Sequence, residues 1–133
     1  MAKEAVITIV KSGLDILVVK KIDDGGQSLM SDQWHLPGET KQAGESNEET
    51  VVRGIREETR ILVTAIRFLT NSITPKETLL YWYECEALSR DVVPGDDAVD
   101  AKFVPKTEVS SVCSTYSVEM WPEFIKQYFG LVD

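Results

Sequence analysis

Two adjacent glutamates, Glu57 and Glu58, are the residues whose type and spacing best suit chemistry in this sequence. Neighbouring carboxylates repel each other, which raises the affinity of the pair for a cation placed between them. Hard divalent cations such as Mg²⁺ prefer carboxylate and carbonyl oxygens as ligands. The simpler alternative is that Glu57 forms an ion pair with Arg53 one helical turn earlier, and that Glu58 is solvated. The pair therefore indicates a metal site if its surroundings supply further ligands.

A helix must position the two glutamates. Ser46 followed by Glu49 is a capping-box pattern, which predicts a helix from Asn47 to Thr59. One face of this helix is suited to packing on a sheet, and it contains Val51, Val52, Ile55 and Thr59. A neighbouring polar strip contains Asn47, Thr50, Gly54, Glu57 and Glu58. Because the helix dipole disfavours carboxylates near the C-terminus by about 0.3–1 kcal/mol each, stability alone does not explain the glutamates.

The rest of the chain predicts a sheet and a second helix. Apolar runs bounded by turn residues predict strands over Ala5–Val10, Leu14–Lys20, a short segment around Trp34, Ile61–Phe68, Thr78–Ala87 and Val99–Val104. Helical spacing of apolar residues predicts a helix over Ser117–Phe129, with Pro122 in its first turn. Strands alternating with two helices indicate an α+β fold or an α/β/α sandwich with a mixed β-sheet. A length of 133 residues suits one domain over residues 1–133.

The charge of the chain narrows the choice of partners. The formal net charge is −8, from 14 basic and 22 acidic residues, and no basic run is present. A protein that follows a nucleic-acid backbone needs the opposite balance, so we expect no nucleic-acid polymer as a partner. An anionic substrate would require a cation between itself and this protein. The alternative is that the acidic surface only keeps the protein in solution.

The cysteines and the N-terminal residues indicate the compartment. Cys85 and Cys113 are far apart and have no CxxC spacing, so neither a disulfide framework nor a zinc site is indicated. The apolar run after the first four residues is shorter than a signal or membrane segment. We therefore expect a cytoplasmic protein with free thiols that does not bind a membrane.

The stretch from Leu36 to Ile61 resembles the signature of the Nudix hydrolase family. That signature is a glycine, five residues, a glutamate, seven residues, and then Arg-Glu-aliphatic-x-Glu-Glu-x-Gly-aliphatic. The matching residues are Leu36-Pro37-Gly38, Gly44-Glu45-Ser46, Arg53, Ile55, Glu57, Glu58, Thr59 and Ile61. The resemblance implies a Nudix-type α/β/α sandwich with a mixed β-sheet.

The resemblance also implies an activity and roles for individual residues. It implies Mg²⁺-dependent hydrolysis of a nucleoside diphosphate linked to another group, with Mn²⁺ as an alternative metal. Glu58 would be the principal metal ligand, Glu57 a second ligand or the base that holds water, and the main-chain carbonyl of Glu39 a further ligand. Glu45 and Arg53 would form an orienting ion pair. The implied partner is a nucleotide-type small molecule, and a homodimer is an option because dimers are common in the family.

The sequence departs from the signature at three positions. Glu39 stands in place of the first glycine, unless one residue has been inserted and Gly38 has that role. Arg60 replaces the last glycine, which should strain or shift a left-handed helix cap. Gly54 replaces the glutamate of the Arg-Glu pair and so removes a carboxylate from the polar strip. Loss of a general base lowers a rate by roughly 10²- to 10⁴-fold.

A carboxylate from outside the signature is the expected substitute for the one missing at Gly54. The candidates are Asp96, Asp97 and Asp100. We favour Asp100 because family members carry an acidic residue a few positions before an aromatic one, and Phe103 follows here. Asp96 and Asp97 also suit a plain turn. The leading prediction is a slow or unusual hydrolase, and the alternative is a catalytically impaired Nudix-fold module for nucleotide binding or regulation.

Overall fold

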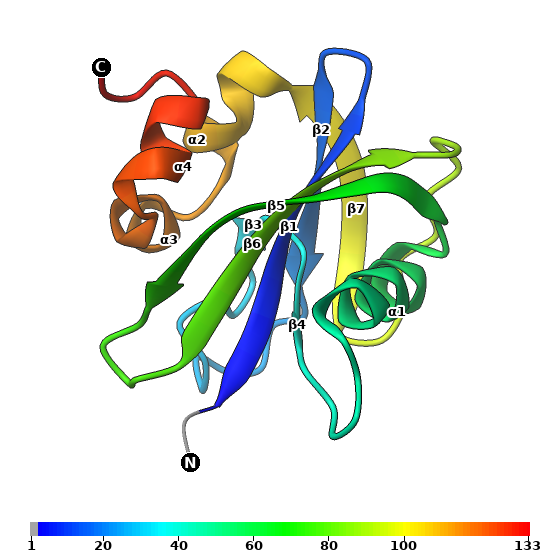
Figure 1. The fold of residues 1–133 in the computed structure, drawn as a ribbon, viewed down its shortest axis with the longest axis horizontal. Coiled ribbons are helices and arrows are strands. Elements are labelled where there is room, and N and C mark those ends of the chain that lie inside the picture. The colour runs from blue at the N-terminus through cyan, green and yellow to red at the C-terminus, as the bar shows by residue number, and fades with distance from the viewer. Residues whose placement is uncertain (1–2) are drawn as a thin grey trace.

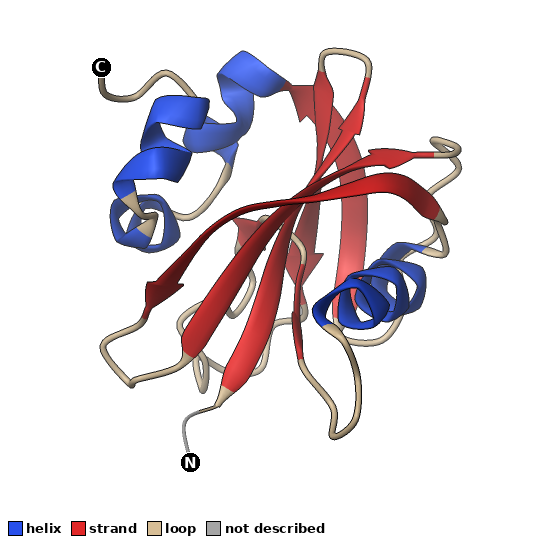
Figure 2. Ribbon diagram, in the orientation of Figure 1, coloured by secondary structure: helices blue, strands red, loops and turns tan. Residues whose placement is uncertain are grey.

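The computed structural model describes residues 3–133, and its centre is a mixed sheet of seven strands (Figure 2). The strands are β1 (Glu4–Ser12), β2 (Asp15–Lys21), β3 (Trp34–His35), β4 (Gly38–Thr40), β5 (Val63–Ile73), β6 (Leu79–Ala87) and β7 (Ala98–Pro105). The main path through the sheet is β3-β2-β1-β6-β5, with β4 paired to β1 and β7 paired to β2. The β1–β6 pair is parallel, and the other pairs are antiparallel.

Helices lie on both sides of the sheet (Figure 1). One side is covered by α1 (Asn47–Thr59). The other side is covered by the C-terminal segments, which are the 3₁₀ turn η1 (Lys106–Glu108), α2 (Val109–Val112), α3 (Thr115–Met120) and α4 (Glu123–Tyr128). The predicted α/β/α sandwich with a mixed sheet is therefore confirmed.

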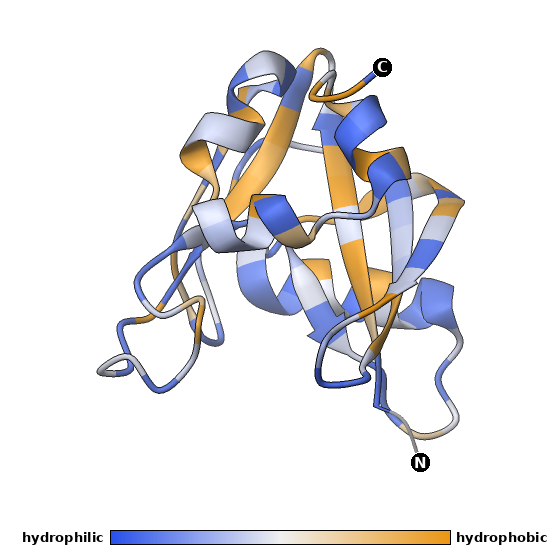
Figure 3. Ribbon diagram, turned by 90° about the vertical axis from the view of Figure 1, so that its left-hand side faces the viewer, coloured by the Kyte–Doolittle hydropathy of each residue, from blue (hydrophilic) through white to orange (hydrophobic). Residues whose placement is uncertain are grey.

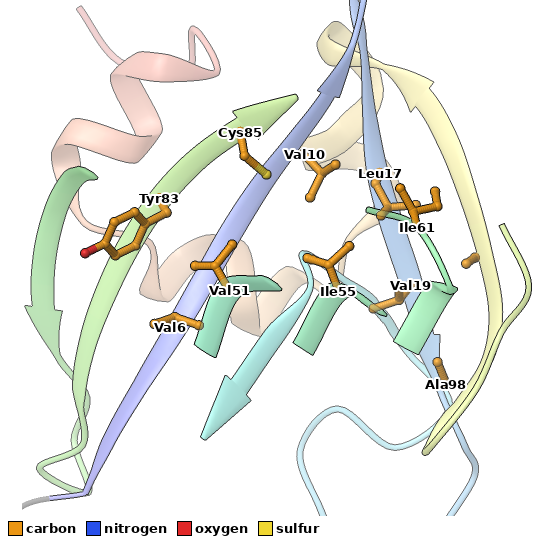
Figure 4. Packing of buried hydrophobic residues seen from close by; sticks show 11 residues of the cluster. Val6, Val10, Leu17, Val19, Val51, Ile55, Ile61, Tyr83, Cys85 and Ala98 are labelled. Carbon is orange, nitrogen blue, oxygen red and sulfur yellow. The ribbon is translucent and has the colours of Figure 1, made fainter. Parts of the chain in front are cut away.

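Two hydrophobic cores hold these layers together. Beneath α1, Val51 and Ile55 face the sheet residues Val6, Val10 and Leu17 (Figure 4). The core beneath the C-terminal helices contains Ile9, Ile16, Val18, Trp82, Val109, Trp121 and Ile125. Because alternate residues of β1 and β2 enter opposite cores, these strands are apolar on both faces. Figure 3 shows the same pattern, with hydrophobic residues along the central strands and hydrophilic residues in most of the loops.

Most predicted elements are present at nearly the predicted positions. The helix α1 begins at Asn47 and ends at Thr59, as predicted, and the N-terminal hairpin is formed by β1 and β2. The strand β5 continues to Ile73, beyond the predicted end at Phe68. Cys85 and Cys113 are free, as expected, and lie in the two different cores. Among residues 3–133, no helix is long and apolar enough to cross a membrane.

The prediction of one helix over Ser117–Phe129 was wrong. The structure has two short helices, α3 and α4, separated at Trp121 and Pro122. The first begins earlier than predicted because the side chain of Ser114 accepts a hydrogen bond from the backbone N–H of Ser117 and caps it. Proline disfavours helical backbone in the residue before it, and Trp121 accordingly has an extended ψ of 138°. Pro122 is therefore the N-cap of α4 rather than part of a longer helix.

Candidate metal centre

The helix α1 is fixed at both ends by local hydrogen bonds. At its N-terminus, the N–H of Glu49 donates to Ser46 Oγ at 3.1 Å, and the N–H of Ser46 donates to Glu49 Oε1 at 2.9 Å. At its C-terminus, Arg60 adopts the left-handed conformation with φ 64°. Its N–H donates to the carbonyl of Arg56 at 2.9 Å. Arginine thus takes the backbone conformation that glycine usually supplies at a helix C-terminus.

The loop before β7 packs directly on the C-terminus of α1. The N–H of Val93 donates to the carbonyl of Thr59 at 3.0 Å, and that of Gly95 to the carbonyl of Glu58 at 2.9 Å. These bonds satisfy two carbonyls that the helix itself leaves free. A Cβ atom at Gly95 would lie 2.6 Å from the carbonyl oxygen of Glu57, so this approach requires glycine. The loop thereby brings Asp96 to the end of the helix.

An acidic group forms where this loop, α1 and β4 meet. Glu39, Glu57 and Asp96 each place a carboxylate oxygen within 4.8 Å of the others. Glu58 lies alongside, because it lines with Glu39, Asp96 and Asp97 a hollow of about 290 Å³. Only 5% of Glu58 is exposed, and its Oε1 has no hydrogen-bond partner within residues 3–133. Carboxylate oxygens suit a hard divalent cation, and a buried unpaired one is the feature that such a cation would satisfy.

Two carboxylates at this site, Glu58 and Glu39, have raised pKa values. Burial raises the pKa of Glu58 to about 8, and the negative charges of Asp97, Glu39 and Asp96 act in the same direction. The backbone N–H of Gly38 opposes this rise. Burial also raises the pKa of Glu39, and the nearby Arg53 guanidinium opposes that effect. Within the described residues, nearby positive charge does not offset the burial of Glu58 and Glu39.

Arg53 fixes the positions of the surrounding glutamates. Its Nε donates to Glu45 Oε2 at 2.6 Å, and its Nη2 donates to Glu45 Oε1 at 3.0 Å and to the carbonyl of Thr40 at 2.9 Å. Its Nη1 lies 3.4 Å from Glu57 Oε2 and 3.5 Å from Glu39 Oε2. The hydrogen bond from Arg53 lowers the pKa of Glu45 to about 2. Arg53 therefore holds Glu45 firmly and contacts two members of the acidic group.

The structure brings together some of the residues that the sequence singles out. Glu39 and Glu57 are in the acidic group, but Glu39 contributes its side chain, whereas the sequence predicts a role only for its carbonyl. Asp100 lies on β7 as an exposed residue opposite Lys20, and its Oδ1 accepts a hydrogen bond from the N–H of Ala101 at 2.8 Å. It lies outside the acidic group that residues 3–133 form. Asp96, which the sequence offers beside Asp97 and Asp100 as a candidate carboxylate, is the one of the three that lies in the group.

An open pocket of about 800 Å³ begins at this site. Glu58, Asp97 and Gly38 line it together with two cationic residues, Lys21 and Lys76. A second pocket of about 260 Å³ has an apolar lining that includes Ile7, Leu36, Trp82, Met120 and Trp121. The two pockets adjoin, since both are lined by Met30, His35, Thr74 and Tyr116. A molecule with an anionic part and an apolar part would fit across them.

Lys21 and His35 line the open pocket, and their charge states determine how much positive charge it contains. The Nζ of Lys21 lies 2.7 Å from Asp97 Oδ2, so these two side chains neutralise each other. Burial lowers the pKa of His35, so its ring is neutral at pH 7. Its Nδ1 is 2.8 Å from the carbonyl oxygen of Leu36, which favours the tautomer that carries a proton on Nδ1. The ring therefore adds no positive charge to the pocket.

Comparisons with known proteins place this chain in a family. A family model described as NUDIX domain matches residues 1–122. A NUDIX hydrolase from Nitrosomonas europaea is 16% identical, with a TM-score of 0.76 over 97% of this chain and 73% of that one. The NUDIX domain of Shewanella oneidensis NrtR, solved in complex with ADP ribose, is 17% identical, with a TM-score of 0.74 over 96% of this chain and 88% of that one.

A third structure is similar over part of its length. A MutT/nudix family protein from Enterococcus faecalis is 19% identical with a TM-score of 0.68, and the match covers 79% of this chain but 44% of that protein. No curated protein matches the sequence. Because the family model covers nearly the whole chain and the sheet and helices have the same arrangement in these structures, the chain belongs to the NUDIX domain family.

Proposed function

We propose that this protein hydrolyses a phosphoanhydride bond in a nucleoside diphosphate linked to another group, and that it requires Mg²⁺. The observation that carries the proposal is the carboxylate of Glu58, which is buried beside three other acidic side chains and has an unpaired oxygen within the described residues. Burying such a group without a partner is unfavourable. A bound divalent cation would supply the missing partner.

The residues present fit a hard divalent cation. The available donors are carboxylates from α1, β4 and the loop before β7, which Mg²⁺ prefers and which Mn²⁺ also accepts. When bound, the metal would neutralise charge that develops on the diphosphate and make a water molecule more acidic. Glu58 would be its principal ligand, since Glu58 has the buried unpaired oxygen.

The side chains around the metal would position the reacting water and the diphosphate. Glu57 is favoured as the base that holds the water, because it belongs to the acidic group and its side chain is 41% exposed. Asp100 is the second candidate for this role and lies outside the group. Arg53 and Glu45 would keep Glu57 and Glu39 in place through their short ion pair. Lys76 lines the adjoining pocket and would contact phosphate oxygens, and Lys21 lines the same pocket with its charge paired to Asp97.

The two adjoining pockets support a substrate that joins a phosphate chain to a flat or apolar group. The apolar pocket carries aromatic surface from Trp82, Tyr116 and Trp121, on which a base would stack. ADP-ribose is the first compound to test, because the NUDIX domain of the Shewanella oneidensis protein was solved with it. Its two ribosyl groups are linked through a diphosphate, which is the bond type that the proposal requires.

A second candidate function is nucleotide binding without efficient turnover. The observation that favours it is Gly54, because the Nudix signature has a glutamate at this position of the helix. In that case the metal and the pockets would hold a nucleotide, and the base would be too weak or too distant to activate water. The protein would then act as a binding or regulatory module.

A substrate panel distinguishes the two functions. Nucleoside triphosphates, oxidised nucleotides, ADP-ribose, dinucleoside polyphosphates and nucleotide sugars are incubated with Mg²⁺ or with EDTA, and the products are separated. We expect hydrolysis of at least one compound only with Mg²⁺, and a loss of about 10²-fold or more in Glu58→Gln. Glu86→Gln is the matched control, since Glu86 is exposed on β6. Nucleotide binding without products would favour the module, and undiminished turnover in Glu58→Gln would refute the metal assignment.

A further inference from the structure

Gly54 on α1 is in contact with the side chain of Glu39 on β4. A Cβ atom added to Gly54 would lie 2.7 Å from the Cβ of Glu39 and 3.1 Å from its Cγ. Packed atoms do not approach so closely without displacement, so Glu39 leaves no space for a side chain at position 54. Glycine inside a helix is destabilising relative to alanine. Its presence in the middle of α1 therefore has a packing reason, and that reason is Glu39.

The side chain of Glu39 extends from this contact into the acidic group. Its Oε1 accepts a hydrogen bond from the N–H of Thr40 at 3.1 Å, and its Oε2 lies 3.5 Å from Arg53 Nη1. One of its oxygens is within 4.8 Å of ligand atoms of Glu57 and Asp96. Oε2 also lies 3.6 Å from the point where a Cβ of residue 54 would be. The carboxylate therefore occupies the region that a longer side chain from position 54 would reach.

Positions 39 and 54 carry the two residue types of the Nudix signature in the opposite order. The signature has glycine at position 39 and glutamate at position 54, whereas this chain has Glu39 and Gly54. We infer that the two positions have exchanged side chains, so that Glu39 supplies from β4 the carboxylate that the signature places on the helix. Glu39 then binds the metal through its side chain, together with Glu58, and Glu57 and Asp96 lie beside it in the acidic group. This inference rests on the proposed function, because it assigns a ligand of the same metal site.

The neighbouring Glu58 is an independent sign that the site takes a cation. Its Oε1 is buried and unpaired within the described residues, and it lines the same hollow as Glu39. Placing the charge of Glu39 beside it makes the metal-free site less favourable. Arg53 offsets this charge only in part, because its closest bonds are made to Glu45. A divalent cation bound between the carboxylates would offset the remaining repulsion.

Binding of Mn²⁺ to the folded protein, followed by electron paramagnetic resonance, tests the exchange. Glu39→Gln keeps the shape of the side chain and removes its charge, and it should weaken Mn²⁺ binding by about tenfold or more. Glu39→Gly should weaken binding to a similar degree. The double variant Glu39→Gly/Gly54→Glu should regain an affinity close to that of the wild type, because the carboxylate returns from the helix side. Glu86→Gln, at an exposed position on β6, should bind Mn²⁺ as the wild type does.

The packing part of the inference has a readout that needs no metal. In EDTA, Gly54→Ala should lower the Tm of the wild type, because its Cβ would meet Glu39 at 2.7 Å. In the Glu39→Gly background, the same substitution should raise the Tm, since the space is then open and alanine favours the helix. If Gly54→Ala lowers the Tm in the wild type and raises it in Glu39→Gly, residues 39 and 54 compete for the same space.

The outcomes separate this inference from the proposed function. It is overturned if Glu39→Gln binds Mn²⁺ as tightly as the wild type, if the wild type binds no Mn²⁺, or if the double variant binds no better than Glu39→Gly. If the variants bind Mn²⁺ as expected while no phosphoanhydride compound is hydrolysed, the proposed hydrolysis fails and Glu39 remains a metal ligand. Loss of hydrolysis in Glu39→Gln with unchanged Mn²⁺ binding would contradict the inference and leave the hydrolase proposal standing.

Discussion

Arg53 and Glu45 form a two-pronged ion pair at the edge of the acidic group, with 2.6 Å between Nε and Oε2 and 3.0 Å between Nη2 and Oε1. The side chains of both residues are only 14% exposed. Glu45 precedes α1 and Arg53 lies in its middle, so the pair ties the loop to the helix. Since Arg53 also contacts Glu39 and Glu57, this one guanidinium connects the loop, β4 and the end of α1.

Replacing Arg53 should therefore affect both stability and metal binding. Arg53→Ala should lower the Tm by about 5–10 °C. Glu45 loses its ion-pair partner, and Glu39 and Glu57 lose the guanidinium that both contact. The substitution should also weaken Mn²⁺ binding, because Glu57 and Glu39 are no longer held in place. Differential scanning calorimetry measures the first effect. Arg56→Ala, at an exposed position of the same helix, is the control, and equal Tm values for the two variants would contradict the role given to Arg53.

The stability of the metal-free protein should decrease as the pH rises from about 5 to 8. The pKa of Glu58 rises from 4.5 to about 8 on folding. Between these values the folded state keeps a proton that the unfolded state has lost, so raising the pH favours unfolding. One such group gives a slope of at most about 1.4 kcal/mol per pH unit. Glu39, whose pKa is also raised, acts in the same direction.

Urea unfolding in EDTA at several pH values between 5 and 8 measures this slope. Glu58→Gln should reduce the slope, because glutamine has no proton to lose, and it should be more stable than the wild type at pH 8. Saturating Mg²⁺ should also reduce the slope in the wild type, because a cation stabilises the charged form. Equal slopes for wild type and Glu58→Gln would show that Glu58 does not titrate in this range.

Gly95 should be required for the position of Asp96. In Gly95→Ala, the new Cβ would lie 2.6 Å from the carbonyl oxygen of Glu57, so the loop must move away from the helix. We expect a lower Tm and weaker Mn²⁺ binding, because the loop carries Asp96 and Asp97. Gly130→Ala should also lower the Tm, because its φ of 74° disfavours alanine, but it should leave Mn²⁺ binding unchanged. Unchanged metal binding in Gly95→Ala would exclude Asp96 from the site.

Ser46 should contribute to stability through its cap and not through the metal. Ser46→Ala removes the oxygen that accepts from the N–H of Glu49 and should destabilise the protein by about 1 kcal/mol. Ser46→Thr keeps a hydroxyl and should recover most of this loss. Urea unfolding measures both variants. A variant Ser46→Ala as stable as the wild type would mean that packing of α1 alone determines where the helix begins.

The parts of the fold that the sequence predicts are those with local causes. The bounds of α1 follow from the cap at Ser46 and from the apolar spacing of Val51 and Ile55, which lie within one helix. The hairpin of β1 and β2 follows from two apolar runs joined by a short turn. The division between α3 and α4 was missed although its causes are also local, since Ser114 caps α3 and Pro122 disfavours helical backbone at Trp121.

The parts of the site that the sequence does not predict depend on contacts between distant residues. Glu39 reaches the acidic group because β4 pairs with β1, with Glu39 opposite Val6, and no local pattern marks so short a strand. Asp96 was one of three aspartates that the sequence offered, and the packing of Gly95 on the C-terminus of α1 is what brings it to the group. The reciprocal departures at Glu39 and Gly54 were visible in the sequence, but their meaning required the distance between them.

The most direct test of the account is the affinity of Mn²⁺ for the wild type and for Glu58→Gln, measured by electron paramagnetic resonance on protein shown by circular dichroism to be folded. The substitution keeps the volume of the side chain and removes the charge that the proposed metal neutralises. The account predicts saturable binding to the wild type and a loss of about tenfold or more in the variant. Equal binding by the two proteins, or no binding by the wild type, would contradict it.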